Sequence, residues 1–363
     1  MQMSRPRPLI SLNLEAPIRS NNSSDDHEIP RKTWLQYLPL AFLVFLMLLP
    51  HPSFLIILVN HYIRTLHKPV VFIVHLLITY AITFLAFSSL IVCVARDPGP
   101  VSSQKSDADA GSEDGEMGLT EALMSGVGDD DMSPSKWCRK CWAPRPDRAH
   151  HCSICDRCVL KMDHHCPWLG SKCVGHRTYP AFLHFIFSVT ALATYIGTVS
   201  GFAFWFSINN PFSIDAVTPI HELFMTFAGV AISLVMGSFL VYHMYLVSTN
   251  QTTLESMSPF VLLRHLPPLP ASLRLSEPPL EHELSYNQRK LVKSAHKSVR
   301  LYDVGWKQNW AQVFGWKKPW GWVHRVFNGG GGKGDGRTFL RNPKADDMLS
   351  RLAMELAKVD KDI

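Results

Sequence analysis

Three features are scarce in this chain of 363 residues: cysteine outside one short block, basic residues in one loop, and charge deep inside the long apolar runs. Seven of the eight cysteines lie between positions 138 and 173, and only Cys93 stands elsewhere, within an apolar run. Secreted chains pair their cysteines, whereas clustered cysteines in a reducing compartment serve as metal ligands and reactive thiols. The pattern therefore favours a metal-binding block over a disulfide framework, and Cys93 is expected to be a packed core residue.

The N-terminal segment lacks an apolar core near its start. No signal peptide is therefore expected, and Gln2 excludes N-terminal myristoylation. Residues 1–33 are polar and predict a disordered cytosolic tail. Residues 102–135 are rich in Ser, Gly and Asp, with nine carboxylates between positions 107 and 131. Such a segment buries too little apolar surface to offset its ordering entropy, so it is expected to be a disordered spacer or a regulatory phosphorylation segment.

Four apolar runs, at about 37–59, 70–95, 181–207 and 222–247, each reach the roughly 20 residues that a membrane helix needs. Pro50 predicts a kink or an early end in the first run. The runs carry no charge at mid-membrane depth, which argues against a transporter. His184 and His243 stand near the ends of their runs, and we expect them at the membrane interface.

The loop between the third and fourth runs contains no Lys or Arg and should therefore be lumenal. The cysteine block and the C-terminal tail both carry basic residues, so they should face the cytosol. Four spans place both termini on that side. The net charge of +6 comes largely from segments beside the apolar runs, which indicates a lipid bilayer as partner and no nucleic acid.

The cysteine block contains one more cysteine than two zinc sites need. Tetrahedral zinc takes four Cys or His ligands, usually in closely spaced pairs. Two sites need eight ligands; six cysteines and two histidines supply them, and the seventh cysteine is left over. Cys166 is the best candidate for this spare thiol because it directly follows Asp163, His164 and His165. A cysteine beside a histidine base and an orienting carboxylate is the arrangement of an activated nucleophile.

The Asp-His-His-Cys tetrapeptide, inside a cysteine block spaced without a gap from Cys138 to Cys166, resembles the DHHC protein S-acyltransferases (palmitoyltransferases), and the linker and tail composition resembles fungal members. The resemblance implies that Cys166 accepts the acyl group, His164 is its base and Asp163 orients His164. It also implies two interleaved structural zinc ions. The ligands of the first would be Cys138, Cys141, His151 and Cys158. Those of the second would be Cys152, Cys155, His165 and Cys173.

Two positions depart from the family pattern. Six residues separate Cys166 from Cys173, where the family usually has five, and Thr178 stands where the family usually has Asn. A loop can absorb one extra residue without losing the ligand, so we expect the zinc site and the activity to survive both changes.

The resemblance extends beyond the cysteine block. Asp97-Pro98-Gly99 matches the family's DPG tripeptide after the second span, and Thr252-Thr253-Leu254-Glu255 matches its TTxE motif after the fourth. Thr253 and Glu255 are therefore expected to brace the zinc domain, and Asn309 to be the buried Asn of the family's C-terminal aromatic motif. Trp168 is expected to line the mouth of an acyl-chain cavity, and Leu192 to line its wall.

The sequence thus predicts a mainly α membrane protein with four transmembrane helices and a small cytosolic double-zinc domain between the second and third. The expected divisions are 1–33, 34–96, 97–135, 136–180, 181–248 and 249–363. The implied activity is transfer of a long-chain acyl group from acyl-CoA (palmitoyl-CoA) to cysteines of membrane-associated proteins at the cytosolic face of an endomembrane (Golgi, ER or vacuole). The alternative is a membrane-anchored zinc-binding adaptor or RING-like ubiquitin ligase.

Overall fold

The computed structural model describes residues 33–101, 137–269, 275–276, 278–315, 332 and 334–359. The predicted polar tail up to residue 32 and the acidic segment 102–135 lie outside these residues, as do positions 328–331 and 333 of the Gly-rich segment 328–337. The same is true of three of the C-terminal tryptophans, Trp316, Trp320 and Trp322.

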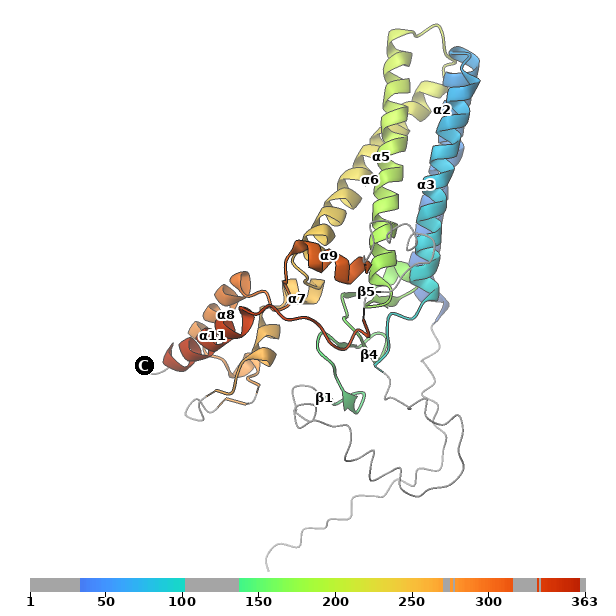
Figure 1. The fold of residues 1–363 in the computed structure, drawn as a ribbon. Coiled ribbons are helices and arrows are strands. Elements are labelled where there is room, and N and C mark those ends of the chain that lie inside the picture. The colour runs from blue at the N-terminus through green and yellow to red at the C-terminus, as the bar shows by residue number, and fades with distance from the viewer. Residues whose placement is uncertain are drawn as a thin grey trace, which may run out of the picture. The chain divides into compact units, whose positions relative to one another are not determined.

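Four long helices form the apolar part of the chain (Figure 1). The first runs without interruption over Trp34–Thr65 and comprises η1 (Trp34–Tyr37), α1 (Leu38–Leu48), α2 (Pro50–Leu58) and the π-helical η2 (Val59–Thr65). The others are α3 (Pro69–Ala95), α5 (Tyr179–Asn209) and α6 (Thr218–Ser248). Each is long and apolar enough to cross a membrane. The prediction of a mainly α multi-pass membrane protein with four spans is confirmed.

Pro50 does not end the first helix, so the early end expected there is wrong. Leu49, just before it, keeps helical dihedrals (φ −52°, ψ −40°), and its N–H still donates to the Phe45 carbonyl at 2.9 Å. Pro50 starts α2, and because it has no N–H the continuous helix lacks one backbone hydrogen bond there, the bond to the Leu46 carbonyl. The helix nevertheless continues for fifteen residues beyond Pro50, to Thr65.

Helix α5 is the most buried of the four spans and packs against both α3 and α6. Gly197 of α5 meets Gly229 of α6 so closely that a Cβ at Gly229 would lie 2.5 Å from the Gly197 Cα. The backbones can approach in this way only because neither residue has a side chain. In the first turns of α6, the buried Glu222 carboxylate accepts a 2.6 Å hydrogen bond from Ser207.

The cysteine block folds between α3 and α5 as three antiparallel hairpins. They pair β1 (Trp137–Cys138) with β2 (Ala143–Pro144), β3 (His150–Cys152) with β4 (Arg157–Val159), and β5 (His164–Cys166) with β6 (Lys172–Val174). A short turn of 3-10 helix, η4 (Pro167–Leu169), follows β5 and contacts α1. With strands of two or three residues, this block has few backbone pairings of its own, so other bonds must supply its stability.

The segment after α3 ties this helix to the cysteine block. The Gly99 N–H donates to the Asp97 carboxylate at 2.9 Å, and the same carboxylate forms a 2.7 Å ion pair with Arg157 on β4. The Gly99 carbonyl accepts from the Leu160 N–H at 2.8 Å. Gly99 has φ +112°, which a residue with a side chain rarely adopts. The tripeptide at 97–99 therefore docks the block on the end of α3.

The C-terminal region contains α7 (Thr253–Met257), η5 (Pro259–His265), η7 (Glu281–Glu283), α8 (Tyr286–Ser298), α9 (Trp306–Phe314) and α11 (Ala345–Val359). Leu349, Leu352 and Leu356 of α11 are buried, as their spacing predicts. In α9, Asn309, Val313 and Phe314 are buried. Trp306 is 63% exposed and does not share that buried face.

Candidate active site and metal centres

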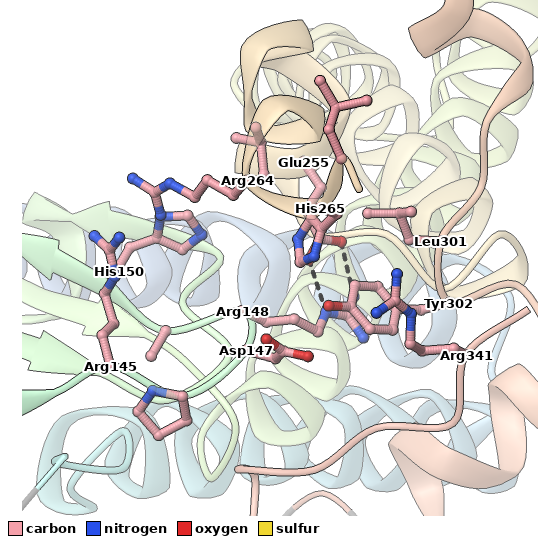
Figure 2. A pocket seen from close by; sticks show the side chains of 14 residues that line it. Arg145, Asp147, Arg148, His150, Glu255, Arg264, His265, Leu301, Tyr302 and Arg341 are labelled. Atoms are coloured by element: carbon pink, nitrogen blue, oxygen red, sulfur yellow. Dashed lines mark hydrogen bonds and ion pairs between the residues drawn. The ribbon is translucent and has the colours of Figure 1, made fainter. Parts of the chain in front are cut away.

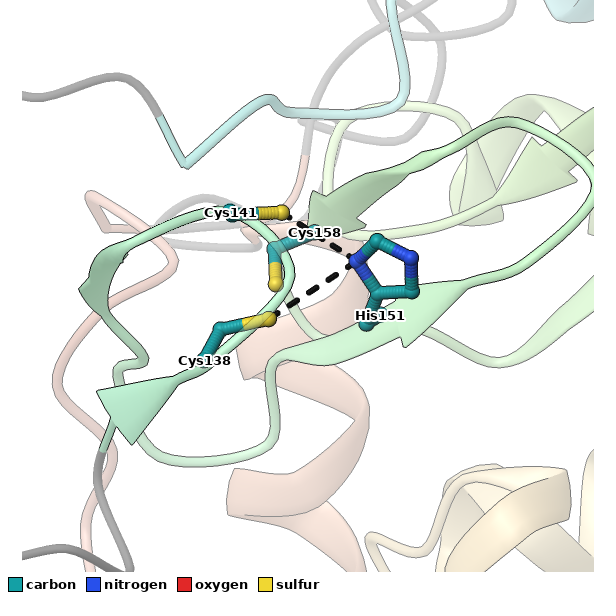
Figure 3. Close-up of side chains that lie close together, drawn as sticks. All are labelled: Cys138, Cys141, His151 and Cys158. Atoms are coloured by element: carbon teal, nitrogen blue, oxygen red, sulfur yellow. Dashed lines mark hydrogen bonds between the residues drawn. The ribbon is translucent and has the colours of Figure 1, made fainter. Parts of the chain in front are cut away.

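The first cluster of metal-binding side chains joins the β1–β2 hairpin to β3 and β4 (Figure 3). One atom from each of Cys138, Cys141, His151 and Cys158 lies within 4.8 Å of all the others. The Nδ1 atom of His151 is 3.1 Å from the Cys141 sulfur and 3.7 Å from the Cys138 sulfur. Three sulfurs and one imidazole nitrogen at these separations fit a tetrahedral zinc ion.

The second cluster, Cys152, Cys155, His165 and Cys173, meets the same criterion. The Nδ1 atom of His165 lies between 3.4 and 3.7 Å from the three sulfurs. Its other ring nitrogen, Nε2, is 3.1 Å from the Ser171 hydroxyl, which orients the ring and leaves Nδ1 facing the sulfurs. Both clusters could bind zinc, and each is a complete set of four donors, as in structural rather than catalytic zinc sites.

Thiols within these clusters are close enough to share protons. The hydrogen bond from the Cys173 thiol lowers the pKa of Cys155 to about 5, although burial raises it. Burial, reinforced by the neighbouring Cys138, raises the pKa of Cys158 well above its usual range. Such crowding is costly for the thiols alone, and a divalent cation that accepts several thiolates relieves it.

The extra residue before Cys173 is absorbed in the turn between β5 and β6. After η4, Gly170 (φ +67°) and Ser171 (φ +51°) both take left-handed conformations. The chain then returns in register, so that Cys173 lies opposite His165. The six-residue spacing therefore leaves Cys173 within the second cluster, and Ser171 in the longer turn bonds His165.

Strand geometry separates the two adjacent histidines of β5. Successive side chains on a strand point to opposite faces, so His164 and Cys166 share one face and His165 points to the other. His165 accordingly joins the second metal cluster. His164 instead turns its Nδ1 atom to the Asp163 carboxylate, at 2.8 Å. Cys166 belongs to neither cluster of metal-binding side chains found in the described residues.

The Asp163 carboxylate is 2% exposed and ionised. Burial acts to raise its pKa, but the hydrogen bond and charge of His164 and the hydroxyl of Thr253 outweigh burial and lower it. Burial likewise acts to lower the pKa of His164, and its hydrogen bonds to Asp163 and Cys166 raise it to about 9. The raised pKa makes the imidazole a stronger base, and it lies between a fixed carboxylate on one side and the Cys166 thiol on the other.

Thr253 holds the Asp163 carboxylate from the opposite side. Its backbone N–H donates to Oδ1 at 2.9 Å, and its hydroxyl donates to Oδ2 at 2.7 Å. The preceding Thr252 caps α7 by accepting from the Glu255 N–H, and the Glu255 side chain accepts from the Thr252 N–H. This capping box fixes the first turn of α7, so that Thr253 is presented to Asp163.

Glu255 forms a buried ion pair with Arg148, which precedes β3 (Figure 2). The guanidinium donates to both carboxylate oxygens, at 2.7 and 2.9 Å, and also to the side chain and carbonyl of Asn250. It stacks over the ring of Tyr302, 4.3 Å from the centroid. Burial acts to raise the pKa of Glu255, but the charge of Arg148 outweighs it and lowers it. The motif after α6 thus joins the cysteine block to the C-terminal region.

Two basic residues of the cysteine block, Arg148 and Lys172, are both engaged within the protein. Arg148 is 5% exposed and saturated by Glu255 and Asn250. The Lys172 ammonium donates to the Val94 carbonyl at the end of α3. Both side chains are therefore held by partners within the protein.

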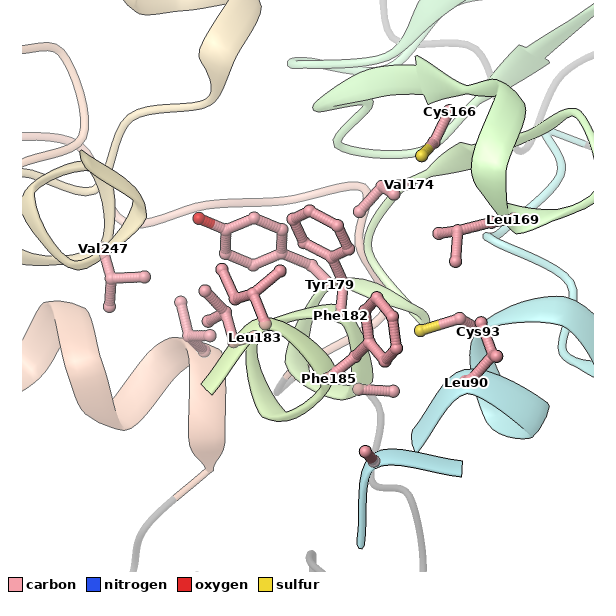
Figure 4. Packing of buried hydrophobic residues seen from close by; sticks show 14 of the residues in the cluster. Leu90, Cys93, Cys166, Leu169, Val174, Tyr179, Phe182, Leu183, Phe185 and Val247 are labelled. Atoms are coloured by element: carbon pink, nitrogen blue, oxygen red, sulfur yellow. The ribbon is translucent and has the colours of Figure 1, made fainter. Parts of the chain in front are cut away.

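The Cys166 side chain lies at the edge of an apolar cluster where the helices meet the block (Figure 4). Cys93, Leu169 and Phe182 belong to the same cluster, and Cys93 is 2% exposed, which confirms its expected place in the core. Trp168 is 46% exposed, and its ring centroid lies 6.4 Å from that of Phe42 on α1. The thiol therefore faces apolar side chains from several spans.

Leu192 is 6% exposed and lies in a second apolar cluster, farther along α5. It packs there with Phe54 of α2, Ile196 and Met225. From Tyr179 to Leu192, α5 advances about 20 Å at the standard helical rise. The two clusters follow each other along α5, one beside Cys166 and the other around Leu192.

His243 is the site residue that sequence reasoning missed. It was expected near the end of its span at the membrane interface, but its partners were not predicted: it is fully buried, and its Nδ1 atom is 3.2 Å from the Tyr179 hydroxyl. Its ring centroid lies 6.1 Å from that of His164, and Phe182 packs against both rings. The sequence signal that could have indicated this role is an ionisable residue in the last turns of α6, ten positions before Thr253.

Two other predicted residues are buried and bonded. Thr178 is 1% exposed, and its hydroxyl accepts from the Gly175 N–H at 3.1 Å just before α5 begins. Asn309 is 0% exposed and donates to the Ser248 carbonyl at 2.8 Å and to the Asp303 carboxylate at 2.7 Å. Asn309 therefore ties α9 to the end of α6.

Comparison with known proteins agrees with this geometry. Residues 131–259 match the family model described as DHHC palmitoyltransferase. The chain is 42% identical over 124 residues to Palmitoyltransferase pfa3 of Emericella nidulans, covering 34% of this chain and 24% of that protein. It is 33% identical over 190 residues to Probable protein S-acyltransferase 1 of Arabidopsis thaliana, covering 48% of this chain and 55% of that protein. It is 31% identical over 206 residues to Palmitoyltransferase ZDHHC2 of Mus musculus, covering 56% of this chain and 46% of that protein. The chain thus spans about a quarter to a half of the length of these relatives, and the expected resemblance to the DHHC family and to its fungal members is confirmed.

Proposed function

We propose that this chain is a protein S-acyltransferase that moves a long-chain acyl group from acyl-CoA to protein cysteines through a thioester on Cys166. One observation carries the proposal. Cys166 stands outside both four-donor clusters and beside a buried Asp163–His164 pair, with its thiol against apolar side chains. An adaptor or ubiquitin ligase with structural cysteines alone would need neither the spare thiol nor the oriented imidazole.

In the first half-reaction, His164 takes the thiol proton of Cys166, and the thiolate attacks the thioester carbonyl of acyl-CoA. A new carbon–sulfur bond forms at Cys166, the bond to the CoA sulfur breaks, and His164 returns the proton to the departing CoA thiolate. Asp163, bonded to Nδ1 of His164, leaves Nε2 as the nitrogen that handles the proton. The carboxylate also stabilises the imidazolium while the proton is held.

In the second half-reaction, His164 takes the proton of a substrate cysteine, whose thiolate attacks the acyl-Cys166 thioester. The acyl group passes to the substrate sulfur, and Cys166 recovers its proton from His164. The kinetics are ping-pong because CoA leaves before the protein substrate reacts. The two zinc ions, when bound, supply cross-links that hold the hairpins of the block and with them the position of β5.

The acyl chain would lie among the spans, beginning at Cys166 and extending along α5 toward Leu192. The apolar clusters at these two positions support this placement because an acyl tail must be kept from water. Trp168, two residues after Cys166, and Phe42, whose ring lies near that of Trp168, would flank the entrance. CoA itself would remain outside the apolar region, near the basic residues of the block.

The zinc block, the C-terminal region and the substrates would lie on the cytosolic side of an endomembrane, with substrate cysteines near its surface. The loop at 208–217, which lacks Lys and Arg, would be lumenal. A glycosylation acceptor inserted at position 213 should be modified in cells. Failure of modification there, in a chain that still inserts and folds, would reverse the orientation.

The activity is tested by incubating the purified protein with alkyne-tagged palmitoyl-CoA and mapping the hydroxylamine-sensitive label. The wild-type protein should carry the label on Cys166, and Cys166→Ser should carry none. Cys93→Ala is the matched control, since Cys93 is the other described thiol of the same apolar cluster and should be dispensable for labelling. Label that persists in Cys166→Ser, or its complete absence from the folded wild-type protein, would contradict the proposal.

A further inference from the structure

His243 is a buried ionisable residue that lies beside the proposed catalytic pair and has no part in the two half-reactions described above. It stands near the cytosolic end of α6, and its side chain is 0% exposed. Its ring centroid lies 6.1 Å from that of His164, and Phe182 packs 5.2 Å from each of the two rings. Phe182 also belongs to the apolar cluster that contains Cys166 (Figure 4). The His243 ring therefore borders the place where the Cys166 thiol would react.

Aromatic neighbours hold the His243 ring in one orientation. Phe239, one turn earlier on α6, meets it edge to face, with centroids 4.6 Å apart and an interplanar angle of 87°. Phe182 on α5 meets it at 78°. Edge-to-face contacts of this kind are favourable because the positive edge of one ring faces the negative face of the other. The direction of each ring nitrogen is thus fixed by packing.

Tyr179 fixes which of the two nitrogens carries the proton. Its hydroxyl lies 3.2 Å from Nδ1 of His243, and no other partner bonds this hydroxyl among the described residues. When the hydroxyl donates to Nδ1, the ring proton must be on Nε2. The opposite arrangement would leave both the hydroxyl proton and the Nε2 lone pair without a partner in a buried place. The hydrogen-bond network therefore assigns the Nε2–H tautomer.

This Nε2–H group is a buried donor without an acceptor. Within the part of the chain that the structure describes, Nε2 of His243 has no hydrogen-bond partner. A buried polar group without a partner costs roughly 1–3 kcal/mol, and such groups are rare in folded proteins. An acceptor that arrives with the substrate would satisfy the donor, and its position beside His164 indicates that this acceptor belongs to the reacting group.

The proposed reaction creates such an acceptor twice. Attack on the thioester places negative charge on the carbonyl oxygen, first when Cys166 takes the acyl group and again when it gives the group up. A carbonyl bond is only about 1.2 Å long, so this oxygen stays close to the Cys166 sulfur. Asp163 and His164 are occupied by the proton transfer. Among the buried side chains described in the cluster around the thiol, only Tyr179 carries an O–H or N–H group, and its hydroxyl already bonds His243.

We propose that His243 is a further catalytic residue, which donates its Nε2–H to the carbonyl oxygen of the acyl group as that oxygen becomes negatively charged. The inference rests on the acyl transfer through Cys166 proposed above. The proton stays on Nε2 throughout, so His243 stabilises charge and does not act as an acid or a base. Tyr179 is a positioning residue, because its hydroxyl keeps the donor on the nitrogen that faces away from it.

Two amide substitutions at position 243 separate the donor from the packing. The amide of Asn reaches about as far as Nδ1 of a histidine, and the amide of Gln about as far as Nε2. His243→Asn therefore keeps a partner for Tyr179 but has no donor at the Nε2 position. Loss of one such donor costs on the order of a hundredfold in kcat. In single-turnover acylation by palmitoyl-CoA, His243→Asn should show this loss with KM nearly unchanged, and His243→Gln should be at least tenfold faster than His243→Asn.

Tyr179→Phe tests the positioning role. It removes the hydroxyl and keeps the ring, so both tautomers of His243 become available and kcat should fall severalfold. Tyr242→Phe is the matched control: Tyr242 also contacts the His243 ring, at 5.8 Å between centroids, but its hydroxyl makes no hydrogen bond among the described residues. It should acylate at the wild-type rate. Zinc content and Tm are measured on every variant.

The infrared carbonyl band of the acyl-enzyme provides a readout that packing alone would not move. With palmitoyl-CoA labelled with 13C at the carbonyl carbon, the thioester band of acyl-Cys166 should lie at lower frequency in the wild-type protein than in His243→Asn, because a hydrogen bond weakens the C=O bond. The same band in both proteins, together with equal kcat, would overturn the role of His243 while leaving acyl transfer in place. Equal kcat in His243→Asn and His243→Gln would do the same.

Two remaining outcomes are also decisive. If His243→Asn loses zinc, the comparison passes to Tyr179→Phe, and a rate there equal to that of Tyr242→Phe would overturn the proposal. A folded wild-type protein that takes no label on Cys166 would instead overturn the acyl transfer itself, and the role of His243 with it.

Discussion

The hydroxyl of Thr253 should matter for catalysis although it touches neither Cys166 nor a metal-binding side chain. Three groups donate to the buried Asp163 carboxylate: the Thr253 N–H at 2.9 Å, the Thr253 hydroxyl at 2.7 Å and the His164 ring at 2.8 Å. The Thr253 hydroxyl and His164 share one carboxylate oxygen, Oδ2. Thr253→Val removes the hydroxyl with little change in shape and leaves the backbone bond in place.

The expected loss follows from the charge on the acceptor. A hydrogen bond to a charged group contributes roughly 1.5–3 kcal/mol, about twice a neutral one. Asp163 acts when His164 carries the proton, so a less firmly held carboxylate costs most in the transition state. Each 1.36 kcal/mol of transition-state stabilisation corresponds to about a factor of ten in rate. Thr253→Val should therefore lower kcat for acyl-Cys166 formation by roughly tenfold, with KM for acyl-CoA nearly unchanged.

The assay is single-turnover acylation by labelled palmitoyl-CoA, with zinc content and thermal stability measured on the same samples. Thr253→Ser is the control because it keeps the hydroxyl and removes only the methyl group. It should retain most of the wild-type rate. The reasoning fails if Thr253→Val acylates at the wild-type rate. It also fails if Thr253→Ser is as slow as Thr253→Val, or if Thr253→Val loses zinc, since the effect would then come from folding.

Three further outcomes are expected. Cys166→Ser should keep both zinc ions and remain folded. Cys158→Ser should lose zinc and become protease-sensitive, because structural zinc binding is worth on the order of 10 kcal/mol. Metal analysis would contradict the division of cysteines if Cys166→Ser lost a zinc ion. The raised pKa of His164, about 9 when folded against 6.5 when unfolded, stabilises the protein below pH 6.5, and this contribution is lost as the pH rises through about 9. Tm should therefore fall more steeply over that interval in the wild-type protein than in Asp163→Asn, and parallel Tm profiles would refute the link. Leu192→Phe should shift the preferred acyl chain to a shorter length in acyl-CoA competition, because it enlarges a side chain in the deeper apolar cluster. An unchanged preference for acyl-chain length would show that Leu192 does not line the wall of the acyl-chain cavity.

Much of the candidate site could be read from the sequence because its chemistry is local. Each cluster contains one pair of cysteines separated by two residues, and a hairpin brings the other two ligands of the cluster opposite each other over a short distance along the chain. The alternation of side chains in β5 separates His164 and Cys166 from His165, so the division of the two histidines is a property of strand geometry. The four spans were predictable for a similar reason, since apolar length alone decides whether a helix can cross a membrane.

The remaining features depend on contacts between distant segments. Thr253 reaches Asp163 across 90 positions, and Arg148 reaches Glu255 across 107, only because the end of α6 docks on the cysteine block. Periodicity assigns residues to a face of an element but not to a partner. For that reason the sequence placed His243 near the end of its span but did not indicate its neighbours, Tyr179 and His164.

Sequence by itself determined which residues can bind metal, which thiol is left over and where the chain can cross the bilayer, because spacing and hydropathy encode these properties along one dimension. Tertiary structure alone decided what surrounds the thiol and which charges are neutralised. The packing of α6 and α7 against the block buries Asp163 and Glu255 with their partners, and the folding back of the C-terminal region places the Tyr302 ring against the Arg148 guanidinium. These outcomes depend on three-dimensional burial, which sets the cost of every unpaired charge and hydroxyl.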